Sequence, residues 1–221
     1  MITIAITINK GGVGKTNTTK SLAVAATQSG FNVLVLDMDS QKNAASWGKR
    51  REKQKKPLPL VKAIDEQELP DELKRAAKAR CDLVLIDTPP GRNSESLAAI
   101  EVADLVLIPF WNDQDSYDGV TRTAGIARRM NKQAVGVLNF AAPNSRSHKE
   151  TAQEVLQVIG LTMATVVLHR YDVHRLASIK GLTAQEVEPK SRAATEIKAL
   201  WNWVSATLQL SKRATVHKGA A

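Results

Sequence analysis

The sequence predicts an α/β protein with one doubly wound, mostly parallel β-sheet flanked by helices in a single domain. Short apolar runs recur along the chain and are separated by amphipathic stretches of helical length. Buried strands that alternate with helices form a parallel sheet, because each parallel connection needs a crossover that is usually helical. The length of 221 residues suits one domain with one well-packed core.

The predicted strands are the short apolar segments, and the predicted helices are the longer amphipathic ones. The strands are Ile2–Ile8, Asn32–Leu36, Leu83–Ile86, Leu105–Ile108, Ala134–Leu138 and Thr162–Leu168. The helices are Thr16–Ser29, Leu69–Ala79, Tyr117–Met130, Lys149–Ile159 and Ser191–Leu210. In such sheets the ligand binds outside the carboxyl ends of the strands, where this chain has Asn9, Asp37, Asp87, Pro109 and Asn139.

Composition excludes several classes of protein. Cys81 is the only cysteine, so the chain cannot form an internal disulfide or supply the four or so ligands of an iron–sulfur cluster, and a reducing cytosol fits. The apolar runs are too short to span a bilayer. We expect no signal peptide and no N-terminal DNA-binding module, because the first predicted strand begins at Ile2 and leads directly into a motif.

The formal net charge is +9 at pH 7. An excess of this size either serves solubility or attracts a polyanion, such as DNA or an anionic membrane. Charge alone does not choose between these partners. One basic cluster follows the second strand, and it is either a solvated helix face or a surface for DNA or an acidic partner. Its members are Lys49, Arg50, Arg51, Lys53, Lys55 and Lys56.

A glycine-rich loop lies between the first predicted strand and the first predicted helix, and reads Asn-Lys-Gly-Gly-Val-Gly-Lys-Thr over residues 9–16. Glycines let backbone N–H groups close around phosphate oxygens, and the following helix adds its N-terminal dipole. Lys15 is expected to reach the β- and γ-phosphates of ATP, and Thr16 to ligate Mg²⁺. A dinucleotide-binding loop would instead need glycine at the position of Asn17. The fold is therefore predicted to be that of a P-loop NTPase, with nucleotide contacts from Gly11, Gly12, Val13, Gly14, Lys15, Thr16 and Asn17.

A second lysine, Lys10, departs from the usual pattern of this loop, and Asn9 stands where the first glycine is expected. Lys10 lies at the outer edge of the loop, so it need not turn toward its own nucleotide. If two loops face each other, each Lys10 can reach the other subunit's γ-phosphate and supply positive charge there. The alternative is a lysine that is simply solvated.

Three aspartates at strand ends complete the predicted site. Asp87 follows an apolar strand, as the magnesium-binding carboxylate of a Walker B motif does. Asp37 and Asp39 lie on one side of an extended segment, because side chains alternate there. We expect Asp39 to orient the attacking water, and Asp37 to support a metal site formed with Asp87 and Thr16. A single such aspartate is more often a turn residue or helix cap, whereas three beside a P-loop favour a site.

These motifs resemble those of the ParA/MinD family of deviant Walker ATPases. The resemblance rests on Lys-Gly-Gly-Val-Gly-Lys-Thr, Asp-Met-Asp-Ser-Gln and Asp-Thr-Pro-Pro, and it continues through the block from His169 to Glu196. It covers nearly the whole chain and is strongest to the small ParA-type partition ATPases without an N-terminal helix-turn-helix domain. Ser40 departs from the proline, and Asn17 from the threonine, that are usual at these positions.

The resemblance implies an ATP-dependent sandwich dimer that binds duplex DNA non-specifically and hydrolyses ATP when a ParB-type centromere-binding protein stimulates it. It implies that Lys10, Lys15 and Asp39 are the catalytic residues and that Asn139 contacts adenine. Arg170 matches the family's DNA-contacting arginine, and neighbouring cations widen that surface: Arg175, Lys180, Lys190, Arg192 and Lys198. We expect a cytoplasmic, nucleoid-associated protein with an ATPase domain at residues 1–210 and a basic flexible tail at residues 211–221.

Other functions remain open. A MinD-like positioning ATPase needs a C-terminal amphipathic helix with a basic polar face to bind a membrane, and the last predicted helix lacks such a face, so we do not expect a membrane partner. A ParA-like positioner of another cargo, such as a protein organelle, has the same ATPase chemistry. A biosynthetic enzyme with the same loop is disfavoured because the sequence shows no second substrate site.

Overall fold

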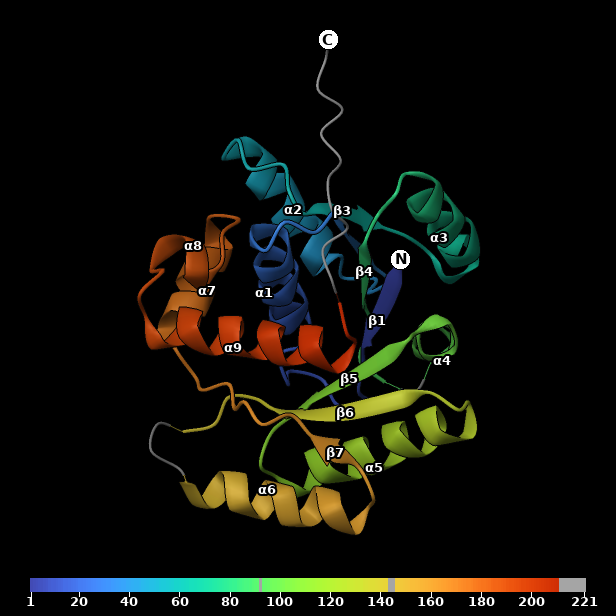
Figure 1. Ribbon diagram of the computed structural model, residues 1–221, viewed down its shortest axis with the longest axis vertical. Helices are drawn as coiled ribbons and strands as arrows, with labels where there is room; N and C mark the ends of the chain where they lie inside the picture. The colour runs from blue at the N-terminus through green and yellow to red at the C-terminus, as the bar shows by residue number, and fades with distance from the viewer. Residues whose placement is uncertain (92, 143–145, 211–221) are drawn as a thin grey trace.

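The computed structural model describes residues 1–91, 93–142 and 146–210 (Figure 1). The predicted fold class is confirmed: seven parallel strands form one sheet in the order β3-β2-β4-β1-β5-β6-β7. The strands are β1 (Ile2–Ile6), β2 (Val33–Asp37), β3 (Leu60–Ala63), β4 (Leu83–Asp87), β5 (Leu105–Phe110), β6 (Gln133–Leu138) and β7 (Thr162–Met163). The predicted tail, residues 211–221, lies outside the described residues.

Helices cover both faces of the sheet (Figure 1). They are α1 (Lys15–Gln28), α2 (Asn43–Lys53), a 3₁₀ turn η1 (Glu66–Glu68), α3 (Leu69–Lys78), α4 (Ser94–Val102), α5 (Gln114–Arg129), α6 (Arg146–Val158), α7 (Asp172–Ile179), α8 (Ala184–Val187) and α9 (Arg192–Thr207). In the described part of the chain, no helix is long and apolar enough to cross a membrane.

Several short elements are absent from the sequence prediction. β3 and the helices α4, α7 and α8 are at most nine residues long, so their hydrophobic period is too short to stand out. Helix α2 is rich in charged residues, which mask its apolar face. Its N-terminus has no side-chain cap of its own, because Lys42 precedes it with a left-handed backbone.

The predicted strand Thr162–Leu168 is wrong in its length, because only Thr162–Met163 form β7 beside β6. The N–H groups of Ala164 and Leu168 both donate to carbonyl oxygens of β6. The two donors are four positions apart in sequence, whereas their acceptors, Gly136 and Leu138, are only two positions apart, so a regular ladder cannot continue. The extra residues bulge away from the sheet, and His169 then pairs again beyond the end of β6.

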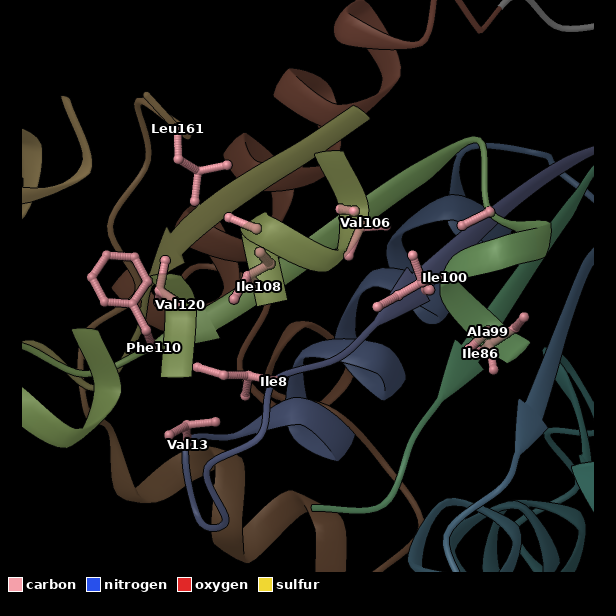
Figure 2. Close-up of a cluster of buried hydrophobic side chains, with 14 of the residues drawn as sticks. Ile8, Val13, Ile86, Ala99, Ile100, Val106, Ile108, Phe110, Val120 and Leu161 are labelled. Atoms are coloured by element: carbon pink, nitrogen blue, oxygen red, sulfur yellow. The ribbon is translucent and has the colours of Figure 1, made fainter. Parts of the chain in front are cut away.

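Two apolar cores hold the helices to the sheet. On one face, α3, α4, α5 and α6 pack on the strands, and Figure 2 shows Ile100 of α4 and Val120 of α5 within this cluster, together with Phe110 of β5. On the other face, Leu22 of α1 and Trp201 of α9 belong to a second core with α2. All five side chains are at least 97% buried, and burying each stabilises the fold by about 1.5–3 kcal/mol.

A buried ion pair ties α2 to the segment before α9. The Nη1 atom of Arg51 lies 2.7 Å from Oε2 of Glu186, and Nη2 lies 3.0 Å from Oε1. Arg51 also donates to the carbonyl oxygens of Leu58 and Gly181. Burial raises the pKa of Glu186, but the hydrogen bonds and charge of Arg51 outweigh this and hold it below its usual value. Arg51 is therefore a structural residue rather than part of a solvated basic face.

We expect Glu186→Gln to lower the free energy of unfolding by about 3–5 kcal/mol, because it leaves the buried Arg51 charge without a counter-charge. Urea denaturation at pH 7 measures the change. Lys190→Gln, an exposed substitution in the same segment, is the control and should stay within about 0.5 kcal/mol of the wild type. Equal stability of the two variants would contradict the structural role of the ion pair.

Candidate functional site

The candidate site lies where neighbouring strands send their connections to opposite faces of the sheet. β1 pairs with β4, yet β1 leads to α1, whereas β4 leads to α4 on the other face. Such a switch point, at the carboxyl ends of β1 and β4, is where open α/β sheets bind their ligands. Asp37 of β2 and Asp87 of β4 are direct partners in the parallel register, so both predicted metal carboxylates lie together at this edge of the sheet.

The P-loop connects β1 to α1 at this edge of the sheet, and its conformation requires glycine. Gly12 and Gly14 have φ values of 77° and 91°, a left-handed region that glycine occupies without strain. A Cβ atom at Gly14 would overlap the side chains of Asn139 and Phe140. No side chain caps the start of α1, so its first N–H groups remain to bind phosphate oxygens.

Lys15 lies inside this loop and is 6% exposed. Its ammonium nitrogen lies 3.2 Å from the carbonyl oxygen of Lys10. Burial lowers the pKa of Lys15, and the charges of Asp87 and Asp39 oppose that shift. A buried cation on a loop of backbone donors suits the phosphates of a nucleotide.

Asp87 is fully buried and incompletely paired. Its Oδ1 atom accepts a hydrogen bond from the Thr19 hydroxyl at 3.2 Å, whereas its Oδ2 atom has no partner among the described residues. Burial raises the pKa of Asp87 to about 7, against the opposing effect of the Thr16 hydroxyl. An unpaired carboxylate oxygen near that hydroxyl fits a Mg²⁺ site, because Mg²⁺ binds one or two protein oxygens and completes its shell with phosphates and water.

The other two aspartates shape the loop after β2. Asp37 accepts backbone hydrogen bonds at both oxygens, from the N–H groups of Asp39 at 3.1 Å and Ala45 at 2.8 Å. It thereby replaces the missing cap of α2. Asp39 is 8% exposed and accepts from the N–H group of Gln41 at 2.9 Å. Asp37 thus fixes the segment that carries Asp39.

Lys10 turns away from the rest of the P-loop. Its ammonium lies 2.6 Å from the Asp113 carboxylate and 3.6 Å from that of Asp115, and it lies over the Trp111 ring. The hydrogen bond from Lys10 to Asp113, more than the opposing burial, raises the pKa of Lys10. Asp113 also caps α5 through the Ser116 N–H group. The sequence analysis missed these two carboxylates, and only a capping pattern before α5 marked Asp113.

Asn139 braces the P-loop from the end of β6. Its amide donates to the carbonyl oxygen of Val13 at 2.9 Å, and its side-chain oxygen accepts from the N–H group of Phe140. The predicted contact with adenine stays a prediction, which the position of Asn139 beside the P-loop supports.

A cavity of about 750 Å³ opens beside the P-loop. Thr16 and Asn17 line it, as do Arg170 and Arg175, two of the predicted DNA-binding residues. The other predicted DNA contacts are exposed elsewhere on the surface: Lys180, Lys190, Arg192 and Lys198. Lys20 and Arg50 also line the cavity. The sequence analysis did not predict that either residue belongs to a site. Arg50 lay within the predicted basic cluster, and Lys20 follows Thr16 by one helical turn.

We expect Asp87→Asn to flatten the pH dependence of stability. The raised pKa means that the folded protein binds a proton that the unfolded chain releases between about pH 4 and pH 7. The free energy of unfolding of the nucleotide-free wild type should therefore fall as pH rises through this window, by up to about 1.4 kcal/mol per pH unit. Urea unfolding at pH 5, 6 and 7 without Mg²⁺ measures the slope. Identical slopes for the wild type and the variant would contradict this origin.

Comparisons with known proteins agree with this geometry. Residues 4–184 match the family described as the CobQ/CobB/MinD/ParA nucleotide binding domain. The chain is 28% identical to the chromosome-partitioning ATPase Soj of Thermus thermophilus over 99% of this chain and 86% of that protein. It is 27% identical to maintenance of carboxysome distribution protein A of Halothiobacillus neapolitanus over 91% of this chain and 95% of that protein. The structure of Pyrococcus horikoshii septum site-determining protein MinD with Mg-ADP has a TM-score of 0.74 at 19% identity, and the match covers 96% of this chain and 99% of that one.

Proposed function

This chain belongs to the CobQ/CobB/MinD/ParA family of nucleotide-binding domains and is an ATPase of that family, and we propose that it acts in DNA partition. In this proposal it forms an ATP-dependent dimer, binds duplex DNA without sequence preference, and hydrolyses ATP when a ParB-type centromere-binding protein stimulates it. The main support is that Thr16 and Asn17 line the same cavity as Arg170 and Arg175. The cations that DNA binding needs thus lie beside the nucleotide site.

The site residues divide the work of ATP binding and hydrolysis. The backbone of the P-loop and Lys15 bind the β- and γ-phosphates, and Thr16 and Asp87 hold Mg²⁺. When bound, Mg²⁺ neutralises the charge that develops on the phosphate oxygens. Asp39 orients the attacking water. Asp37 supports the metal site by fixing the backbone between itself and Ala45.

The dimer depends on Lys10. Its outward position, away from the ammonium of Lys15, suits a residue that acts on a second subunit. In the ATP-bound dimer Lys10 exchanges Asp113 for the γ-phosphate of the partner subunit's nucleotide, where its charge offsets the repulsion between two triphosphates. ATP therefore controls dimer formation, and hydrolysis reverses it.

DNA binding by this protein is electrostatic. The net charge of +9 and the exposed cations around Arg170 supply phosphate contacts, which need charge and reach but read no bases. Dimer formation doubles these contacts in one rigid body, so that ATP-bound protein binds DNA more tightly than ADP-bound protein. A nucleoid-associated protein follows from this proposal.

Positioning of another cargo is a second candidate, favoured by the similarity to the carboxysome distribution protein. It shares the ATPase and DNA chemistry and differs in the partner. A MinD-like membrane function is less favoured. The apolar face of α9 is buried against the sheet through residues such as Leu200 and Trp201, so within the described residues this helix is not free to enter a membrane.

We expect Asp39→Ala to bind MgATP normally but to hydrolyse it about 10²–10⁴-fold more slowly, because the variant loses only the group that orients water. Single-turnover hydrolysis with DNA and the centromere-binding partner present measures the rate. Glu95→Ala removes a carboxylate that lines the same surface groove as Asp39 and serves as the control. Near wild-type turnover in Asp39→Ala would assign the role to another residue.

We expect Arg170→Glu to abolish ATP-dependent binding to two unrelated DNA duplexes, as measured by mobility shift. The wild-type affinity should fall linearly on a log–log plot against salt, with a slope near −0.9 per phosphate contact. Lys78→Glu makes the same charge change on α3, on the opposite face of the sheet, and should retain binding. Because Arg170 lines the nucleotide cavity, MgATP affinity is measured in parallel. Loss of MgATP binding together with DNA binding would show that Arg170 serves the nucleotide instead.

A further inference from the structure

The cavity beside the P-loop is lined by cations as well as by the predicted nucleotide contacts. We use the term inner half for the part of its lining that three helices supply, α1, α2 and α7, which Figure 1 shows grouped on one face of the sheet. Lys20 comes from α1, Arg50 from α2 and Arg175 from α7. Three elements that are distant in sequence thus each contribute one cation to the same space.

Lys20 is the most enclosed of these cations, with 8% of the residue exposed. Its ammonium donates to the Ser178 hydroxyl at 3.1 Å and lies 5.9 Å from the centre of the Trp47 ring. An ammonium group has three N–H donors, and a hydroxyl oxygen carries no net charge. These contacts therefore give Lys20 no ion-pair partner among the described residues, and the charges of Asp87 and Asp37 act on its ammonium only from farther away.

Arg50 and Lys20 both donate hydrogen bonds to Ser178. The Nε atom of Arg50 donates to the carbonyl oxygen of Ser178 at 3.3 Å, so two cations share one serine. Burial lowers the pKa of Lys20 to about 8; Asp87 opposes that shift and Arg50 adds to it. Two positive charges are thus held together with neutral oxygens between them.

The neighbouring residue Arg51, a buried cation with a structural role, differs from Lys20 in its partners. Arg51 has a carboxylate partner, Glu186, at 2.7 Å, which is the usual arrangement for buried charge. Lys20 has no such partner in the described part of the chain. Both oxygens of Asp37 accept backbone N–H groups and Oδ1 of Asp87 accepts the Thr19 hydroxyl, whereas the unpaired Oδ2 of Asp87 makes no ion pair with Lys20.

One carboxylate among the described residues does line the cavity, that of Asp172, and its residue is exposed to solvent. It stands at the first turn of α7, where an acidic group also interacts with the helix dipole. A single exposed carboxylate does not balance the three cations of the inner half. The inner half therefore retains a net positive charge, with Lys20 buried, Arg50 half-buried and Arg175 exposed.

We propose that this inner half is a second anion site, formed by Lys20, Arg50 and Arg175, which binds a phosphate group alongside the nucleotide. The inference rests on the proposed function only in assuming that a nucleotide binds next to this site. The contacts of the second site itself do not depend on that assumption. Lys20 and Arg50 offer several N–H donors, and the oxygens of a phosphate accept charge-assisted hydrogen bonds from them. The group is either free inorganic phosphate or a phosphate of a nucleic-acid backbone, since both present the same oxyanion.

The test is equilibrium dialysis of labelled inorganic phosphate against the full chain saturated with MgADP, at constant ionic strength set with chloride. We expect the wild type to bind one phosphate per chain. Lys20→Met keeps the length of the side chain but removes its charge, and it should weaken phosphate binding at least about tenfold. Arg50→Gln changes a half-buried residue and should weaken binding severalfold, which keeps the test valid if Lys20→Met fails to fold.

Lys15→Ala is the matched control, because it removes the charge of the P-loop and leaves the inner half intact. Phosphate binding that persists in nucleotide-free Lys15→Ala and is lost in Lys20→Met supports the second site, even if nucleotide binding itself fails. Phosphate that competes with MgADP, or equal binding by the wild type and both inner-half variants, would overturn it. Addition of a short DNA duplex identifies the source, since displacement of bound phosphate assigns the site to the DNA backbone and its absence assigns it to free phosphate.

Discussion

The parallel register between β2 and β4 places Asp37 directly opposite Asp87 at the carboxyl edge of the sheet, and the rest of the site depends on this pairing. Neighbouring parallel strands lie about 4.8 Å apart, so two carboxylates are forced together in a buried place. Each must be stabilised by hydrogen bonds or cations. Backbone N–H groups serve Asp37, whereas the Thr19 and Thr16 hydroxyls serve Asp87.

This arrangement concentrates charged groups without ion-pair partners where a ligand is expected. Among the described residues, one oxygen of Asp87 has no hydrogen-bond partner, Lys15 donates to a backbone carbonyl, and Lys20 donates to a hydroxyl and lies over the Trp47 ring. A ligand that carries both anions and a divalent cation satisfies these groups together. Binding therefore stabilises the folded protein, and the stabilisation grows with the logarithm of ligand concentration.

The C-terminal third of the chain supplies two of the cations that line the cavity, Arg170 and Arg175. Glu186 anchors this segment to α2 through Arg51, and Glu196 of α9 accepts hydrogen bonds from His169 and Tyr171. These contacts hold the chain around Arg170 against the cavity beside α1. Glu196 therefore links two features of the structure: it belongs to α9, which packs on the sheet, and its hydrogen bonds set the position of the segment around Arg170.

The sequence by itself determined the fold class, the P-loop and the strand-end aspartates. These features are local: a glycine pattern, an apolar run, and a carboxylate at its end are each written within about ten residues. The sequence alone did not reveal β3 or the short helices, because elements of this length carry too little periodicity. It also placed seven residues in a last strand of which only Thr162–Met163 form β7.

Only the tertiary structure decided which charges meet. Lys10 and Asp113 are 103 positions apart along the chain, yet their side chains lie 2.6 Å apart. Arg50 and Arg51 are adjacent in sequence, but one faces the cavity and the other is buried against Glu186. Composition and spacing cannot separate such residues, because burial and pairing arise from the packing of helices that are distant in sequence.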